Sequence, residues 1–386
     1  MQMFTDHSFF VWLAALSVPA FLLGVFEKQI KYYGMAVSAF LLWVVLGHDE
    51  RALGWLILFC LVEYAIIRVY LQVRTKGGRK KLPYWFFLIL SISPLIAYKM
   101  MTLTGNPHHI LGFLGISYMT FKVAQIIIEI YDGIIKEISA FEYAYLMLFF
   151  PTVTSGPIDR SRRFCGDLHR KPSRAEYLEL AGSGVYKILL GMVYKIVIAS
   201  ILYFFMNTFG MGRDPFSVLI YYYTYGFYLF FDFAGYSLMA MGAGYMFGIQ
   251  VPENFRRPFV SRNINDFWNR WHITLSHWLR DYVFSRVTMD LMRTRLRRYR
   301  LAIAVIAFMI NMLLMGCWHG LTLSYIAYGL YHGVLLSLYE ILRTKSGTYK
   351  KFSKKKWFAL IEWFITLHLV LFGFFIFSGR LVLLMR

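Results

Sequence analysis

The segment "DFWNRWHITLSHWLRDYVF", residues 266–284, concentrates polar and aromatic side chains in an otherwise apolar chain: three Trp, two His, two Arg and two Asp. At 3.6 residues per turn, residues 265–282 form two stripes on a continuous helix. One stripe is apolar: Phe267, Trp271, Leu275, Trp278 and Tyr282. The other is polar: Asn265, Asn269, His272, Ser276 and Arg280. The pattern predicts either an interfacial helix with an aromatic belt or the polar wall of a buried chamber.

A second polar insertion lies at the end of an apolar run, "AFMINMLLMGCWHGLT" (307–322). Here His319 follows Trp318, and Asn311 precedes it by two turns. Taken alone, such a histidine is either a satisfied core group or an acid–base group. Two histidine-bearing insertions in one membrane chain favour catalysis, because imidazole titrates near neutral pH and is the usual general base.

Other chemistries lack their sequence patterns. The three cysteines, Cys60, Cys165 and Cys317, are far apart, so neither a disulfide framework nor a metal site is expected. There is no HExxH helix, GxSxG elbow or Gly-rich phosphate loop. The remaining chemistry is proton abstraction from a substrate hydroxyl, followed by attack on an activated acyl group supplied by another molecule.

The composition places this chemistry in a membrane. Of 386 residues, 58% are hydrophobic, which is above the roughly 45–50% typical of soluble domains. The mean hydropathy is +0.52. We expect an all-α polytopic membrane protein with about 10–11 transmembrane helices, plus re-entrant or amphipathic helices around a central chamber. The first apolar run has no cleavage site and is expected to be a retained span. The predicted spans are 8–25, 33–48, 53–72, 84–103, 110–131, 178–206, 216–250, 301–318, 321–342 and 357–378.

Two of the apolar segments are unusual. The segment 141–154 is short and precedes a basic loop, which favours a re-entrant or half-buried element. The run 216–250 carries Asp232 and Gly235 at mid-depth, so we expect it to be broken. Asp232 is then either a snorkelling residue beside packing glycines or part of a cavity wall.

The net charge of +20 comes mainly from basic loops at 74–81, 156–174, 286–300 and 343–356. Placing these loops in the cytoplasm puts the N-terminus outside. The charge predicts contact with anionic lipid or an acidic protein, and no nucleic acid is expected. In 285–300, arginines such as Arg295 and Arg298 alternate with apolar residues such as Val287 and Met289. This segment is either a lipid anchor or a docking surface for an acidic carrier.

The chain resembles the membrane-bound O-acyltransferase family in five stretches. These are "FLGISYMTFKV" (113–123), "TSGPIDR" (154–160), "FDFAGYS" (231–237), "NFRRPFVSRNINDFWNRWHITLSHWLRDYVF" (254–284) and "INMLLMGCWHGLTLSYIAYGLYHG" (310–333). It is most similar to the family's D-alanyl-transfer branch of teichoic acid modification. Alginate-type members continue the motif as "WLRDYLYIPLGG", whereas this chain has "WLRDYVFSRVTMDLM".

The resemblance implies what the chain does and with which partners. D-alanine would arrive as a thioester on the 4'-phosphopantetheine arm of a small acidic D-alanyl carrier protein (DltC-like), with no cofactor bound to the chain itself. The acyl group would leave toward lipoteichoic acid as acceptor, in the cell membrane of a Gram-positive organism. A DltD-like membrane protein and a small membrane peptide are the other implied partners.

The resemblance also assigns residues and domain limits. His319 matches the family's catalytic histidine and His272 matches the second motif histidine. The expected substrate-binding residues are Asn269, Trp268, Ser276, Asn311, Trp318 and Asp232. The chain is expected to be a single membrane-embedded domain, 1–386, with peripheral helices in 1–109 and a catalytic core in 110–335. A transporter or flippase without chemistry of its own, and a scaffold, are the alternatives; neither would break a thioester.

Overall fold

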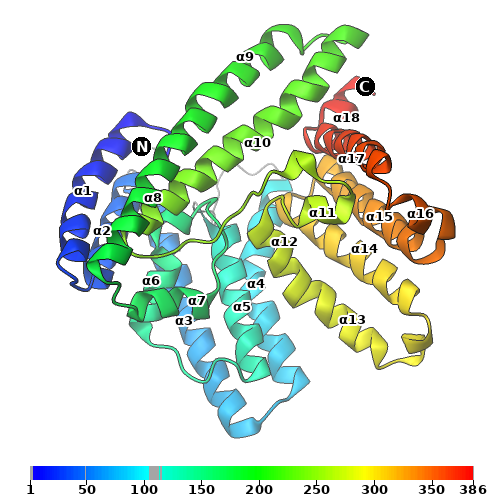
Figure 1. Cartoon of the computed structure of the whole chain (residues 1–386). Helices are drawn as coiled ribbons and strands as arrows, with labels where there is room; N and C mark the ends of the chain where they lie inside the picture. The colour runs from blue at the N-terminus through cyan, green and yellow to red at the C-terminus, as the bar shows by residue number, and fades with distance from the viewer. Residues whose placement is uncertain (1–2, 48, 104–112, 114, 386) are drawn as a thin grey trace. The chain divides into compact units, whose positions relative to one another are not determined.

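The computed structural model describes residues 3–47, 49–103, 113 and 115–385 (Figure 1). These residues form helices joined by short loops, and no strand occurs among them. The chain divides into two compact units, one made of 1–193 with 235–252 and the other of 194–234 with 253–386. This division differs from the predicted boundaries at 109 and 335, and the single domain stays a prediction.

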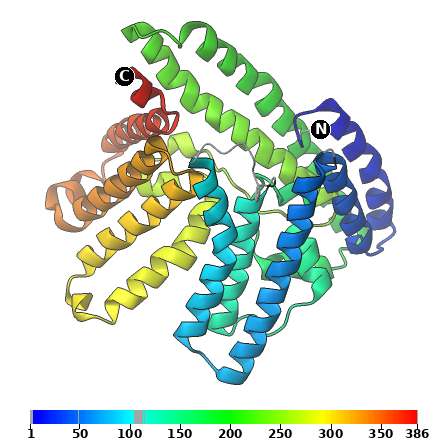
Figure 2. The same ribbon diagram turned by 180° about the vertical axis from the view of Figure 1, so that it is seen from behind.

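The first unit contains the N-terminal helices. They are α1 (His7–Val25), α2 (Lys31–Leu46), α3 (Glu50–Gly77), α4 (Lys81–Leu103), α5 (Ile116–Asp132), α6 (Ala140–Leu148), η1 (Phe150–Thr152), α7 (Ser161–His169) and α8 (Arg174–Met192). Helices α3, α4 and α5 lie side by side (Figure 2). Helix α5 is buried along almost its whole length, and its Lys122 donates hydrogen bonds to the Leu146 carbonyl and Thr152 Oγ1. The first residues of the predicted span 110–131 lie outside the described residues.

The short apolar segment after residue 140 does not cross a bilayer. Its helix α6 has nine residues and ends at Leu148, followed by the 3₁₀ turn η1. At 1.5 Å per residue, α6 is about 14 Å long, against a hydrocarbon core of about 30 Å. Tyr143, Tyr145 and Leu146 are buried. The segment therefore has the dimensions of the predicted half-buried element.

The expected break in 216–250 is wrong, because α10 (Pro215–Met246) is one continuous helix of 32 residues. Its glycines serve close packing against α8: a Cβ on Gly191 would lie 2.7 Å from the Gly235 carbonyl, and one on Gly242 would strike the Gly184 carbonyl. Asp232 forms an ion pair with Lys195, so the helix accommodates it without interruption. Small residues are the usual device for such close helix contacts.

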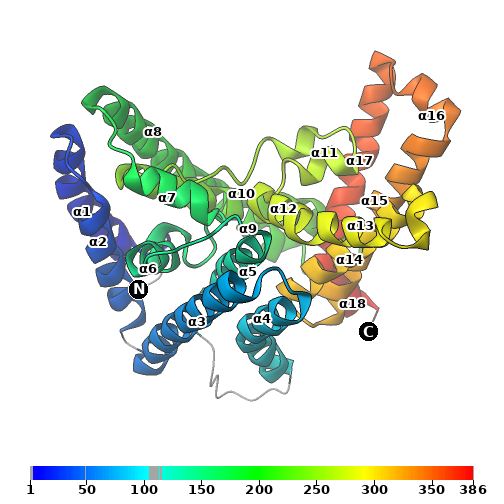
Figure 3. The same ribbon diagram turned by 90° about the horizontal axis from the view of Figure 1, so that it is seen from below.

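The second unit contains the C-terminal half of the chain. Its elements are η2 (Val193–Ile198) where the unit begins, α9 (Ala199–Phe209), the first part of α10, η3 (Pro258–Val260), α11 (Ile264–Trp268), α12 (Ile273–Leu279), η4 (Arg280–Phe284), α13 (Ser285–Met292), η5 (Arg295–Arg298), α14 (Arg300–His319), α15 (Leu323–Lys345), α16 (Gly347–Phe352), α17 (Lys356–Phe377) and α18 (Arg380–Leu384). Helix α15 packs between α14 and α17 (Figure 3). The α14–α15 backbones meet at two glycines, since a Cβ on Gly316 would lie 3.1 Å from the Gly329 Cα.

The described helices identify a multi-pass membrane protein. Six of them are long and apolar enough to cross a membrane by length and composition: His7–Val25, Glu50–Gly77, Lys81–Met101, Arg174–Phe209, Arg300–His319 and Lys356–Phe377. The all-α polytopic fold class is confirmed. Each of the ten predicted spans is helical over most of the residues that the structure describes.

Candidate active site

His272 sits at a break between two short helices. The expected continuous helix over 265–282 is wrong, because α11 ends at Trp268 and α12 begins at Ile273. His272 adopts a left-handed backbone conformation, with φ 43° and ψ 52°. This conformation is uncommon for residues other than glycine and is found preferentially at functional sites.

The loop after α10 fixes this break through backbone hydrogen bonds. The Ile273 amide donates to the Asn254 carbonyl at 2.9 Å, and the Arg256 amide donates to the Arg270 carbonyl at 3.0 Å. These bonds connect residues about 14 to 19 positions apart, and they replace the hydrogen bonds that a continuous helix would have formed. The same loop is anchored to α17, because Trp363 Nε1 donates to the Phe259 carbonyl at 2.8 Å.

The Asn254 side chain orients the His272 ring. Asn254 Oδ1 accepts from the Thr274 amide at 3.3 Å and from Thr274 Oγ1 at 2.7 Å, which identifies it as the carboxamide oxygen. His272 Nδ1 lies 3.3 Å from the same oxygen and is therefore the protonated nitrogen. Nε2 keeps its lone pair, and this buried atom has no hydrogen-bond partner among the described residues. A buried nitrogen held in this state can accept a hydrogen bond from a substrate group.

Aromatic rings enclose His272 on the remaining sides. Its ring centroid lies 4.8 Å from that of Phe233, edge to face, and 6.4 Å from that of Trp318. The neighbouring Trp271 packs against Phe255 and Phe374. The predicted apolar stripe is buried at Phe267, Trp271, Leu275 and Trp278. His272 lies outside the candidate spanning helices. Burial lowers the pKa of His272 to about 3, and the nearby His319 ring lowers it as well.

His319 is the last residue of α14 and is half-buried, whereas His272 is only 3% exposed. The His319 ring centroid lies 4.6 Å from that of Trp318, 5.0 Å from Phe377 and 6.3 Å from Tyr328. Trp318 thus contacts both histidine rings. The arrangement gives one reachable imidazole, His319, and one buried, oriented imidazole behind it.

A cavity of about 170 Å³ lies between α11, α12, α14 and α15. Four predicted substrate-binding residues line it: Trp268, Asn269, Ser276 and Asn311. The buried Trp268 Nε1 and Asn311 Oδ1 have no hydrogen-bond partner in the described part of the chain. Since buried polar atoms are normally paired, these two are suited to a polar ligand.

The other two predicted substrate-binding residues lie elsewhere. Trp318 belongs to the histidine cluster, and Asp232 pairs with Lys195 on η2 without lining the cavity. Residues 194–234 and 253–386 form one unit, so these placements belong to a single body. No group of three or more metal-binding side chains occurs among the described residues.

Sequence reasoning missed three residues of this site. Asn254 orients His272, Phe233 covers it, and His332 is fully buried beside Trp268 with a ring separation of 5.1 Å. Asn254 lies in the quoted stretch that begins "NFRRPF", and His332 in the stretch that ends "YGLYHG", so both carried a signal. Phe233 also lies in a quoted stretch, "FDFAGYS", but its residue type gave no further signal, because apolar helices are rich in phenylalanine.

A helical membrane chain with a reachable histidine, an oriented buried histidine and a small polar cavity has the parts of a membrane enzyme that performs proton transfer at a hydroxyl group. Residues 40–381 match the model of MBOAT, the membrane-bound O-acyltransferase family, and the chain belongs to this family. It is therefore an O-acyltransferase, as the resemblance predicted.

Similar proteins cover the chain from end to end. It is 40% identical to the teichoic acid D-alanyltransferase of Bacillus subtilis, over 98% of both chains. It is 38% identical to the teichoic acid D-alanyltransferase of Streptococcus thermophilus, over 99% of this chain and 96% of that protein. A probable alginate O-acetylase of Pseudomonas syringae is 32% identical over 70% of this chain and 50% of its own length. The predicted similarity to the D-alanyl-transfer (DltB) branch is confirmed.

Proposed function

We propose that this chain transfers D-alanine from a carrier-protein thioester to lipoteichoic acid, at the cell membrane of a Gram-positive bacterium. Full-length similarity to teichoic acid D-alanyltransferases supports the acyl group and the class of acceptor. The single observation that carries the chemistry is the pair of histidines around Trp318. One is reachable, and the other is buried, with no hydrogen-bond partner for its Nε2 among the described residues.

In the proposed reaction, His319 takes the proton from an acceptor hydroxyl. The hydroxyl oxygen attacks the thioester carbonyl, the C–S bond breaks, and the proton passes to the departing thiolate of the phosphopantetheine arm. His272 remains neutral, and its Nε2 is available to accept a hydrogen bond from a polar group of the substrate. Asn311 and Trp268 would hydrogen-bond the amide groups of the arm in the cavity, together with Asn269 and Ser276.

The carrier would dock on α13 and η5. Met289 is 53% exposed, Val287 is half-buried, and Arg295 and Arg298 are exposed. An acidic carrier would be attracted by the arginines and held by the apolar residues. Replacing Val287 or Met289 by Asp should weaken carrier binding at all salt concentrations. If binding in detergent were unchanged, the segment would instead be an anchor on anionic lipid.

The orientation and the partners complete the proposal. An extracellular N-terminus puts the basic loops in the cytoplasm, where the carrier protein would deliver its thioester. A DltD-like membrane protein and a small membrane peptide would act on the outer side; copurification with the chain is the test for each. Protease accessibility of a tag at the N-terminus in intact cells tests the orientation.

The direct test uses purified chain, D-alanyl carrier protein and lipoteichoic acid. The wild type should release free carrier thiol and form D-alanyl ester, and His319→Ala should do both at least about 10²-fold more slowly. His368→Ala is the matched control, because His368 is a half-buried histidine on α17 outside the site. Transport of the intact thioester or acyl group without thiol release would establish the transporter alternative and refute the proposal.

A further inference from the structure

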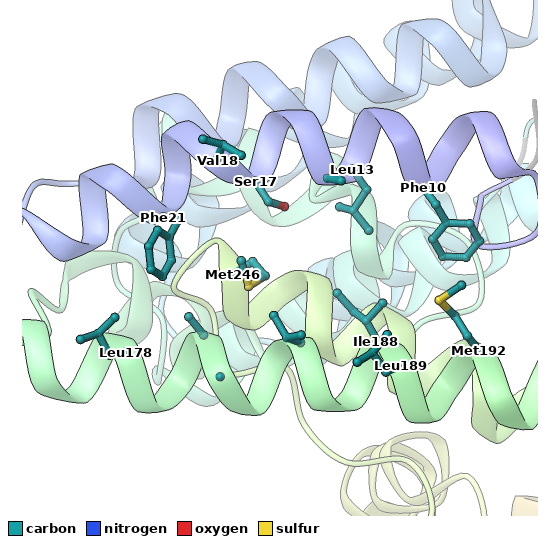
Figure 4. Close-up of a pocket in the computed structure, with 14 residues that line it drawn as sticks. Phe10, Leu13, Ser17, Val18, Phe21, Leu178, Ile188, Leu189, Met192 and Met246 are labelled. Carbon is teal, nitrogen blue, oxygen red and sulfur yellow. The ribbon is translucent and has the colours of Figure 1, made fainter.

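An apolar groove runs between α1 and α8 in the first unit, with Met246 of α10 at its floor (Figure 4). Its volume is about 560 Å³, and Ser17 is the one hydroxyl among its lining side chains. Phe21 and Leu178 lie at one end of the groove, and Phe10 and Met192 at the other (Figure 4). The active-site residues described above all belong to the other unit.

The length of the groove suits one lipid chain. Its lining extends about 16 Å along α1 and about 21 Å along α8, at 1.5 Å per residue. A hydrocarbon core is about 30 Å thick, so the groove covers roughly one leaflet. A partner's transmembrane helix would need contact over the full thickness. An acyl chain, which occupies one leaflet, needs only this depth.

A cationic pocket adjoins the Phe21 end of the groove. It is lined by four basic side chains, against the carboxylates of Glu27 and Asp167: Lys28, Lys31, Arg170 and Lys171. Groove and pocket meet where Met246 lines one and Phe247 the other. On α1, Phe21 lines the groove and Gly24, less than one helical turn later, lines the cationic pocket.

The carboxylates of the cationic pocket are already engaged. Asp167 accepts from the Gln250 amide at 2.8 Å and from Arg163 at 2.6 Å. Glu27 accepts from the Arg174 amide at 2.8 Å. Lys28 and Lys171 are exposed and form no ion pair with the described residues. The pocket therefore keeps positive charge available for an anion beside the membrane.

We propose that the groove and the cationic pocket together bind one anionic glycerophospholipid. One acyl chain lies in the groove between α1 and α8, and the phosphate of the headgroup lies against Lys28 and Lys171. The lipid is a structural or regulatory ligand of the first unit and takes no part in acyl transfer. This inference is independent of the identity of the transferred acyl group.

The first test fills the groove. A Cβ on Gly182 would meet open space, so Gly182→Leu starts a side chain in the groove without a clash at Cβ and improves helix propensity. Gly54→Leu is the matched control, because Gly54 also lies inside a helix and its Cβ would also meet open space. Delipidated protein is titrated with phosphatidylglycerol or phosphatidylcholine, and bound lipid is counted by native mass spectrometry.

The second test removes the charges with Lys28→Gln/Lys171→Gln, against Lys80→Gln/Lys354→Gln as control. The wild type should bind one phosphatidylglycerol at least about tenfold more tightly than phosphatidylcholine. The lysine variant should lose about that preference, and Gly182→Leu should lose both lipids. Ala14→Leu, which fills the groove from α1, repeats the steric test if Gly182→Leu is unstable. Equal binding of the two lipids by the wild type, or undiminished phosphatidylglycerol binding in the groove and lysine variants, would overturn the proposal.

Discussion

Asn254→Ala should separate the orientation of His272 from the stability of its loop. The substitution removes one oxygen that accepts from His272 Nδ1, the Thr274 amide and Thr274 Oγ1. A buried donor left unpaired costs about 1–3 kcal/mol. Two of the three bonds are long, at 3.3 Å, and the Thr274 hydroxyl can rotate to another acceptor. We therefore expect the variant to lose roughly 2–5 kcal/mol of unfolding free energy.

The effect on acyl transfer has a different cause. Without Asn254, the His272 proton can occupy either ring nitrogen, and the ring can turn. In metal sites, outer partners that fix a histidine's tautomer contribute about 10–100-fold, and we expect a loss of similar size in thiol release. Turnover is measured at a temperature well below the melting temperature of the variant, so that unfolding does not contribute.

Thr274→Val is the matched control for this prediction. It removes the hydroxyl that donates to Asn254 but leaves the bond between Asn254 and His272 in place. Its melting temperature should fall, while turnover should stay within about threefold of the wild type, because the imidazole keeps its tautomer. If Thr274→Val lost as much activity as Asn254→Ala, or if Asn254→Ala turned over normally, the role assigned to the tautomer would be refuted.

Four further predictions concern other parts of the second unit. His319→Ala should lose about 10²–10⁴-fold in acyl transfer while keeping its melting temperature, and near-normal turnover would exclude general-base catalysis by His319. His272, whose pKa lies near 3, binds no proton in the folded state at pH 5, whereas the unfolded chain does, so stability is lost as the pH falls below about 6.5. Between pH 7 and pH 5 the wild type should lose roughly 1–2 kcal/mol more than His272→Gln, measured by thermal unfolding; equal losses would contradict a neutral His272. Arg295→Glu/Arg298→Glu should weaken carrier binding and flatten its dependence on salt, and an unchanged salt dependence would place docking elsewhere. Gly316→Ala should lower the melting temperature, because its methyl group would meet the Tyr325 carbonyl at 2.5 Å; no change would mean that α14 and α15 can separate without cost.

Hydropathy predicted the helices well because a bilayer forces each crossing segment to satisfy its own backbone hydrogen bonds. It failed at the two places where a distant residue decides the local structure. His272 breaks the expected helix because Asn254, eighteen positions earlier, binds both its side chain and the amide after it. Asp232 leaves α10 intact because Lys195, 37 positions earlier, pairs with it. Neither partner can be inferred from periodicity, which reports only neighbours within a turn or two.

Within the candidate site, helical periodicity correctly placed Asn269 and Ser276 together, but it assumed a continuous helix that the structure does not have. Asn269 and Ser276 line one cavity although the helix between them is interrupted. They come together because the loop from residue 253 to 263 holds the two short helices in a fixed arrangement. The position of His319 could be predicted from hydropathy, because His319 is the last residue of an apolar helix and that helix alone places it. Catalytic roles for His272 and His319 stay predictions.

The left-handed backbone of His272 gives this position a distinctive tolerance profile in a saturation-mutagenesis library. Asn and Gly enter that conformation with little strain, whereas Val, Ile and Thr do not. Protein abundance in the membrane should therefore be highest for Asn and Gly among the variants at this position. If acyl transfer requires an imidazole at this position, the activities of the same variants would instead depend on the chemistry of the side chain. In a scan that scores abundance and acyl transfer separately, the two scores of the variants at position 272 should therefore not correlate. At a residue that serves only packing, acyl transfer should follow abundance.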